Sequence, residues 1–349
     1  MEALVELFVS SFNIFCKGYV TPNIIYENSE YTMDVANTRY INTKIANTRF
    51  RKQATSKDII IRYNKNPRYY IEFLVFYVSW IKYILNIIKP EVRDVRLKVY
   101  LTSFKKSFPG NQKMLEPYYV NSGVTFTYNH VSYKDVIVYR EEEVFKVLMH
   151  ELIHAFNIDS TCLDDRHEGR FRKYFGRSCK LYLNESFTDT LACIYNCLSF
   201  SLILGRVKKD PDILSLFKMY LARERLYILE KSRDVLTYEG FKWDSDGITH
   251  KGKSTEKTHV ISYYILKALN FYYLNIFFEF LNSEGFHLKD ENAYVYVYQL
   301  YMFLRRKDYW SYISRKKNSK FSSSLRMSDI DINILIYEVK DKLLKNIIH

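Results

Sequence analysis

The alternation of hydrophobic and polar positions changes its period near Glu141. Upstream of it, residues 95–103, 123–128 and 135–139 alternate or are rich in β-branched residues, as is typical of strands. A separate apolar stretch at 70–89 has helical spacing and ends before a proline, which cannot continue a helix. We therefore expect three strands and one long helix in this part of the chain.

Downstream of Glu141, hydrophobic residues recur with the period of a helix, and residues 144–155 are predicted to form one. Further helices are predicted at 183–204, 213–231 and 258–282, with two more towards the C-terminus. Strands followed by helices indicate an α+β protein. We expect a mainly helical fold with a small mixed or antiparallel sheet that precedes the helix at 144–155.

The composition is that of a globular protein, with 48% hydrophobic and 26% charged residues. Five cysteines are odd in number and fit no disulfide framework, which favours a reducing compartment such as the cytoplasm. The apolar stretch 73–88 is short and interrupted by Lys82, and 260–281 contains several polar residues. We therefore expect no membrane span.

The formal net charge is +13, and most of the excess is scattered as in a solvated basic surface. The exception is residues 305–326, where Asp308 is the sole acidic residue among eight basic ones. Such a segment suits an acidic partner or a nucleic acid.

The strongest chemical signal is the H-E-x-x-H motif formed by His150, Glu151 and His154 in the predicted helix at 144–155. Histidines four residues apart lie on one face of a helix, where they can take two corners of a tetrahedral zinc site. Glu151, beside the first of them, is placed to act as a general base on a water at the metal.

A catalytic zinc needs a third protein ligand and one open position. A third histidine six residues after His154 is excluded, because Asn157 and Ser160 occupy the glycine and histidine positions of that pattern. His167 lies in a strongly charged stretch and Asp164 or Asp165 would give an aspartate site, so these three are weaker candidates. We favour Glu185 as the third ligand, with Asp189 one turn later accepting a hydrogen bond from a zinc-bound histidine.

Taken together, the two motifs resemble those of the gluzincins, zinc peptidases that combine H-E-x-x-H with a downstream N-E-x-x-x-D, here from Asn184 to Asp189. The resemblance covers residues 150–189. More loosely, residues 140–146 are similar to zinc-peptidase-like proteins of large DNA viruses, which would place the protein in the host cytoplasm or in a virion.

The resemblance implies a metallopeptidase fold and a catalytic domain at 95–290, between a mostly helical region at 1–94 and a helical, basic region at 291–349. It also implies two further parts of an active site. The first is an upstream edge strand that pairs with the substrate backbone, for which we expect Asn121, Ser122, Gly123 and Val124. The second is a donor to the oxyanion, for which the candidates are His259 and Tyr263.

The sequence therefore predicts a zinc peptidase that binds peptides or proteins, in which Glu151 takes a proton from water and passes it to the leaving amine. Two alternatives remain. One is a non-catalytic structural or assembly protein, possessing the same fold and associated with a virion. The other is a nucleic-acid-binding protein in which the motif arose by chance.

Overall fold

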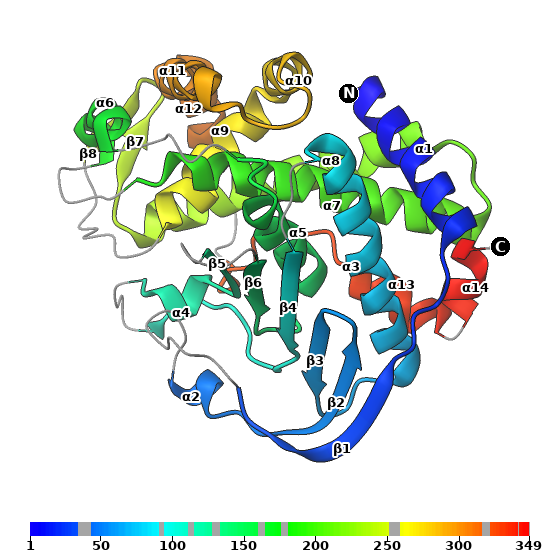
Figure 1. The fold of residues 1–349 in the computed structure, drawn as a ribbon. Helices are drawn as coiled ribbons and strands as arrows, with labels where there is room; N and C mark the ends of the chain where they lie inside the picture. Colours follow the sequence, from blue (N-terminus) through cyan, green and yellow to red (C-terminus); the bar gives the residue numbers. More distant parts are fainter. Residues whose placement is uncertain are drawn as a thin grey trace.

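In the computed structural model, a mixed sheet and a set of helices share one hydrophobic core that extends from Leu4 to Ile347 (Figure 1). The structure describes residues 1–33, 43–90, 94–110, 115–127, 133–159, 165–175, 181–250, 259–315, 322–340 and 342–348. The first helix and the last helix contact each other, and the C-terminus lies near the end of the first helix opposite the N-terminus (Figure 1).

Eight strands are found in the described residues: β1 (Ile25–Tyr31), β2 (Phe50–Ser56), β3 (Ile59–Tyr63), β4 (Asp94–Tyr100), β5 (Gly123–Thr127), β6 (Tyr133–Val138), β7 (Lys242–Asp244) and β8 (Gly247–His250). The first six form one sheet in the order β1-β2-β3-β4-β6-β5, and β7 and β8 form a separate pair. β3–β4 and β4–β6 are parallel, and the other pairs in the large sheet are antiparallel. This mixed sheet confirms the predicted fold class, α+β, and the three predicted strands are β4, β5 and β6.

The α-helices are α1 (Glu2–Gly18), α2 (Thr43–Ala46), α3 (Arg68–Ile88), α4 (Pro117–Val120), α5 (Val144–Ala155), α6 (Asp165–Phe175), α7 (Leu183–Lys208), α8 (Ile213–Tyr238), α9 (Lys267–Tyr272), α10 (Leu274–Ser283), α11 (Ala293–Leu304), α12 (Lys307–Arg315), α13 (Ile332–Val339) and α14 (Lys342–Ile348). A π-helical turn, η3 (Ile261–Leu266), precedes α9, and a 3-10 turn, η4 (Asp290–Asn292), precedes α11. The helix predicted at 258–282 is thus divided into η3, α9 and α10, with the backbone of Tyr273 leaving the helical conformation between α9 and α10.

The prediction of a mostly helical region at 1–94 needs correction, because β1, β2 and β3 lie in it. β1 was missed because it is polar and largely exposed, so its sequence has no hydrophobic alternation. The expected boundary near residue 94 also falls between β3 and β4, which pair with each other in the sheet.

The centre of the fold is α5, which lies between the strands β5 and β6 and the long helix α7 (Figure 1). α7 is buried along most of its length, although it contains several serines and threonines. Thr190, Ser199 and Ser201 each donate a hydrogen bond to the carbonyl four residues earlier, so their hydroxyls are satisfied inside the helix. These two helices place the functional side chains described below.

Candidate metal centre

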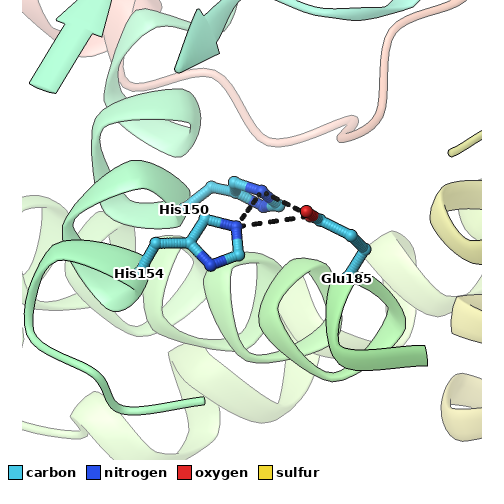
Figure 2. A group of neighbouring side chains, drawn as sticks. All are labelled: His150, His154 and Glu185. Atoms are coloured by element: carbon cyan, nitrogen blue, oxygen red, sulfur yellow. Dashed lines mark hydrogen bonds and ion pairs between the residues drawn. The ribbon is translucent and has the colours of Figure 1, made fainter. Parts of the chain in front are cut away.

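Three potential ligands converge where α5 meets the first turn of α7 (Figure 2). His150 and His154 lie one turn apart on α5, and Glu185 reaches them from α7. Glu185 Oε2 is 3.2 Å from His150 Nε2 and 3.3 Å from His154 Nε2, and the two Nε2 atoms are 3.1 Å apart. This buried cluster can hold a metal ion.

The spacing of the three ligand atoms matches that of a tetrahedral site. Metal–ligand bonds of about 2.0–2.1 Å at tetrahedral angles separate neighbouring ligand atoms by about 3.3 Å. The observed separations of 3.1, 3.2 and 3.3 Å agree with that value. A single small cation can therefore bind all three atoms without a rearrangement of the helices.

The outer nitrogens of both imidazoles face carboxylates. His154 Nδ1 lies 2.8 Å from Asp159 Oδ2, and His150 Nδ1 lies 3.0 Å from Asp189 Oδ1, the latter as an ion-pair contact without ideal hydrogen-bond alignment. Both contacts favour a proton on Nδ1 and leave the Nε2 lone pairs facing the shared point. Glu185 Oε2, also an acceptor, is buried there without a hydrogen-bond partner among the described residues. With both protons on Nδ1, three acceptors face one another at this distance, an arrangement that favours either a metal ion or a proton between them.

The shifted pKa values of His154 and Glu185 also favour a positive charge in the cluster. Burial lowers the pKa of His154, but Asp159 and Glu185 outweigh it and hold that pKa well above its usual value. Burial raises the pKa of Glu185, and the two histidines outweigh it and hold it well below its usual value. Without a metal, a proton therefore occupies the cluster, and a metal ion competes with that proton for the same atoms.

Glu151 lies on the side of α5 that faces β5, and only 6% of it is exposed. Thr125 Oγ1 in β5 lies 2.8 Å from Glu151 Oε2 and 2.9 Å from the backbone oxygen of Glu151. Burial raises the pKa of the Glu151 carboxyl. A carboxylate with a raised pKa beside the metal position has the property required of a general base.

The upstream segment also lies where an edge strand was expected. Asn121 and Ser122 directly precede β5, Gly123 and Val124 begin it, and β5 is the terminal strand of the sheet. Among the described residues it pairs only with β6, so its other side offers backbone groups to a further strand.

The two candidate oxyanion donors are both near the cluster. The Tyr263 ring, in η3, lies 5.7 Å from the His150 ring, and the His259 ring lies 5.6 Å from the Tyr263 ring. Burial and Glu185 hold the pKa of Tyr263 well above its usual value, so its hydroxyl remains protonated. Burial lowers the pKa of His259. Tyr263 is the better placed of the two.

Asp189 has partners that were not predicted from the sequence. Besides His150, it accepts hydrogen bonds from Lys146 and from Lys267, the latter at 2.6 Å. Helical spacing could have revealed Lys146, which precedes His150 by one turn on α5. Lys267 is distant in sequence, and Asp159 lies in an irregular segment after α5, so no sequence pattern identified either of them.

Some predicted residues are not positioned here. Asp164 and Ser160 lie outside the described residues, and the side chains of Asp165 and His167 in α6 do too. Within the basic segment 305–326, Lys307 pairs with Asp246 at 2.9 Å and Arg326 with Asp331 at 3.4 Å. Residues 316–321 are outside the described part, so the predicted acidic or nucleic-acid partner stays a prediction.

Two helices are long and apolar enough to cross a membrane by length and composition, namely α3 and α7. Their most apolar windows are 61% and 89% buried inside the fold, and core helices share these properties. The expectation of no membrane span stays a prediction.

Comparison with known proteins gives no functional assignment. No protein-family model and no solved structure matches the chain. An uncharacterized protein of Acanthamoeba polyphaga mimivirus, R210, is 24% identical over 110 residues, which is 32% of this chain. The match spans 28% of that viral protein's length.

Proposed function

We propose that this protein is a zinc-dependent peptidase whose metal is held by His150, His154 and Glu185. The observation that carries the proposal is the convergence of two imidazole nitrogens and one carboxylate oxygen at 3.1–3.3 Å, with a buried glutamate beside them. The H-E-x-x-H and N-E-x-x-x-D motifs and the edge strand support it, as they belong to one type of peptidase site.

Zinc fits this ligand set better than other common cations. Two neutral imidazoles and one carboxylate are typical of catalytic zinc sites, whereas Mg²⁺ and Ca²⁺ prefer oxygen ligands alone. When bound, the ion would supply a Lewis acid that polarises a peptide carbonyl and makes a nearby water more acidic.

The chain's own residues account for the remaining requirements of peptide hydrolysis. The free side of β5 would bind an extended peptide by main-chain hydrogen bonds and so align its carbonyl with the site. Glu151 would take a proton from the attacking water and deliver it to the leaving amine. The protonated hydroxyl of Tyr263 would donate to the oxyanion that develops on the carbonyl.

The proposed setting is a reducing compartment, either the cytoplasm of a host cell or a virion. The described cysteines Cys16, Cys193 and Cys197 are free and buried, as is usual where thiols stay reduced. The match to a viral protein supports the viral part of this proposal.

Glu151→Gln tests the function most directly, because glutamine has the size of glutamate but cannot take up a proton. We expect the zinc-reconstituted variant to bind one zinc per chain, like the wild type, and to lose at least a hundredfold of its kcat on a fluorogenic peptide library. Retention of full activity would overturn the assigned role of Glu151. A wild-type protein that binds zinc and cleaves no peptide would instead favour the non-catalytic structural alternative.

A further inference from the structure

A small cavity opens beside His150 and Glu151, on the side of the site that faces the start of β5. Its volume is about 20 Å³, enough for one water molecule. Besides the two site residues, its polar lining includes Lys106, Lys146 and Ser122, and Met327 closes part of it. A group in this cavity would be next to the bond that the proposed site cleaves.

Two buried donors on the lining of the cavity have no well-aligned hydrogen-bond partner among the described residues. Lys106 is 2% exposed, and its Nζ lies 3.2 Å from Glu143 Oε2 but makes no well-aligned hydrogen bond among the described residues. The hydroxyl of Ser122, which is 3% exposed, has no partner there either. An ammonium group carries three N–H donors, and Lys106 and Ser122 both line the cavity. The lining also contains one buried acceptor without a partner among the described residues, the side-chain oxygen of Asn121.

The acidic groups around the cavity already have partners, and Glu151 on its lining accepts a hydrogen bond from Thr125 at 2.8 Å. Both carboxylate oxygens of Asp189 are bound by ammonium groups, one by Lys146 and the other by Lys267. Glu143 accepts a hydrogen bond from the backbone N–H of Ser328 at 2.7 Å in addition to its ion pair with Lys106. The remaining contact of Lys146 is a weak one, to the sulfur of Met327 at 3.6 Å.

The lowered pKa of Lys106 also indicates that its ammonium group is incompletely compensated by negative charge. Burial lowers the pKa of its ammonium group, and Glu143 does not compensate fully. Buried donors without partners cost free energy, and a ligand that supplies acceptors recovers it. A carboxylate has two acceptor oxygens and is larger than this cavity, so the flexible side chain of Met327 would have to move to admit it.

We propose that this cavity is a specificity subsite that binds the carboxylate of an acidic residue adjacent to the cleaved peptide bond. This inference rests on the proposed peptidase function and names its substrate class: peptides with Asp or Glu next to the scissile bond. Lys106 and Ser122 are the specificity-determining residues, and Lys146 closes the cavity on its α5 side. The net charge of +13 would favour the approach of such acidic substrates.

The test uses two pairs of peptides with amidated C-termini. The peptides of a pair differ only in Glu or Gln, which stands before a defined bond in one pair and after it in the other. In one of the two pairs, we expect the wild type to cleave the Glu peptide with a kcat/KM at least tenfold above that of the Gln peptide. Equal cleavage of the two peptides would overturn the inference and leave the peptidase function standing. A preference that appears only with a free C-terminus would overturn it as well, in favour of recognition of the chain end.

Lys106→Met and Ser122→Ala test the assigned residues. In Lys106→Met, we expect the ratio of kcat/KM for the Glu peptide to kcat/KM for the Gln peptide to fall towards one. In Ser122→Ala, which is a substitution small enough to leave folding intact, we expect the same ratio to fall several-fold. Lys231→Met is the matched control, because Lys231 is equally buried and pairs with Asp234 at 3.1 Å but does not line the cavity. The inference fails if this control loses the preference as much as the Lys106 variant.

Binding provides a readout that does not depend on turnover. Fluorescence anisotropy with labelled Glu and Gln peptides should show at least a tenfold tighter Kd for the Glu peptide on the Glu151→Gln variant. If the wild type cleaves no peptide, the proposed function fails, and this measurement still decides whether the cavity binds a carboxylate.

Discussion

At the scale of single residues, Gly123 is the position where the sheet approaches the site most closely. A Cβ atom there would lie 2.7 Å from Glu151 Cγ and 2.9 Å from Val147 Cγ1. Such distances are below van der Waals contact, so any side chain would have to displace Glu151 or separate β5 from α5. The absence of a side chain at Gly123 therefore permits the observed position of Glu151, the proposed general base.

We expect Gly123→Ala to lower kcat on a cleaved peptide by roughly a hundredfold, because displacement of a catalytic group by about 1 Å has effects of that size. Zinc content should be unchanged, since the atoms nearest to an added methyl group belong to Glu151 and Val147 and not to the three ligands. Gly18→Ala, at a glycine with open space around it, is the control. Wild-type kcat in Gly123→Ala would show that Glu151 need not occupy its present position.

Sequence reasoning identified the site residues that belong to short, regularly spaced motifs. His150, His154, Glu185 and Asp189 follow helical spacing on two helices, so their meeting required only that the helices pack together. Asp159 lies in an irregular segment after α5 and gave no such pattern. Its contact with His154 depends on how the chain turns after the helix, which local spacing does not determine.

At the scale of elements, α8 is joined to the segment at 328–330 through a buried carboxylate. Glu224 is fully buried, and its Oε2 accepts hydrogen bonds from the backbone N–H groups of Asp329 at 2.9 Å and Ile330 at 3.2 Å. Burial raises its pKa to about 7, despite these bonds and Lys267. The folded protein therefore retains a proton on Glu224 that the unfolded chain, with a pKa near 4.5, has lost.

This difference destabilises the fold as the pH rises. The contribution from the protonated Glu224 is fully present below pH 4.5 and is lost as the pH passes 7, which amounts to roughly 3 kcal/mol at 1.36 kcal/mol per pKa unit. Glu224→Gln keeps an acceptor for the backbone and removes the titration. Between pH 5 and pH 8, we expect urea unfolding to show a smaller loss of stability in this variant than in the wild type.

Glu230→Gln is the control, since Glu230 is an exposed acid on the same helix. It should follow the wild-type profile across this pH range. An identical pH profile for Glu224→Gln and wild type would contradict the assigned burial cost.

Elements with strong periodicity were predictable, and elements defined by tertiary pairing were not. β4, β5 and β6 have clear strand patterns and were predicted close to their observed bounds. β1 is mostly exposed and depends on pairing with β2, which no local pattern reports. The break at η3 was also missed, because its apolar sequence continues into α9 without a proline or glycine.

At the scale of the whole molecule, one core joins the predicted N-terminal, catalytic and C-terminal regions. α5, near the middle of the chain, contacts α3 from the first region and α7 from the second, and Met327 and Ser328 from the third reach Lys146 and Glu143. The site is therefore assembled by the entire chain, and its geometry depends on the integrity of the whole fold. The composition predicted a sizeable core, but it contained no information on these long-range contacts.

The central claim is that His150, His154 and Glu185 bind one zinc ion, and metal analysis by mass spectrometry tests it directly. We expect one zinc per chain in the reconstituted wild type and in His287→Ala, whose histidine is not one of the three clustered ligands. We expect His154→Ala, with an intact circular dichroism spectrum, to hold less than a tenth of that amount after dialysis. One zinc per folded chain in His154→Ala, or none in the wild type, would contradict the account.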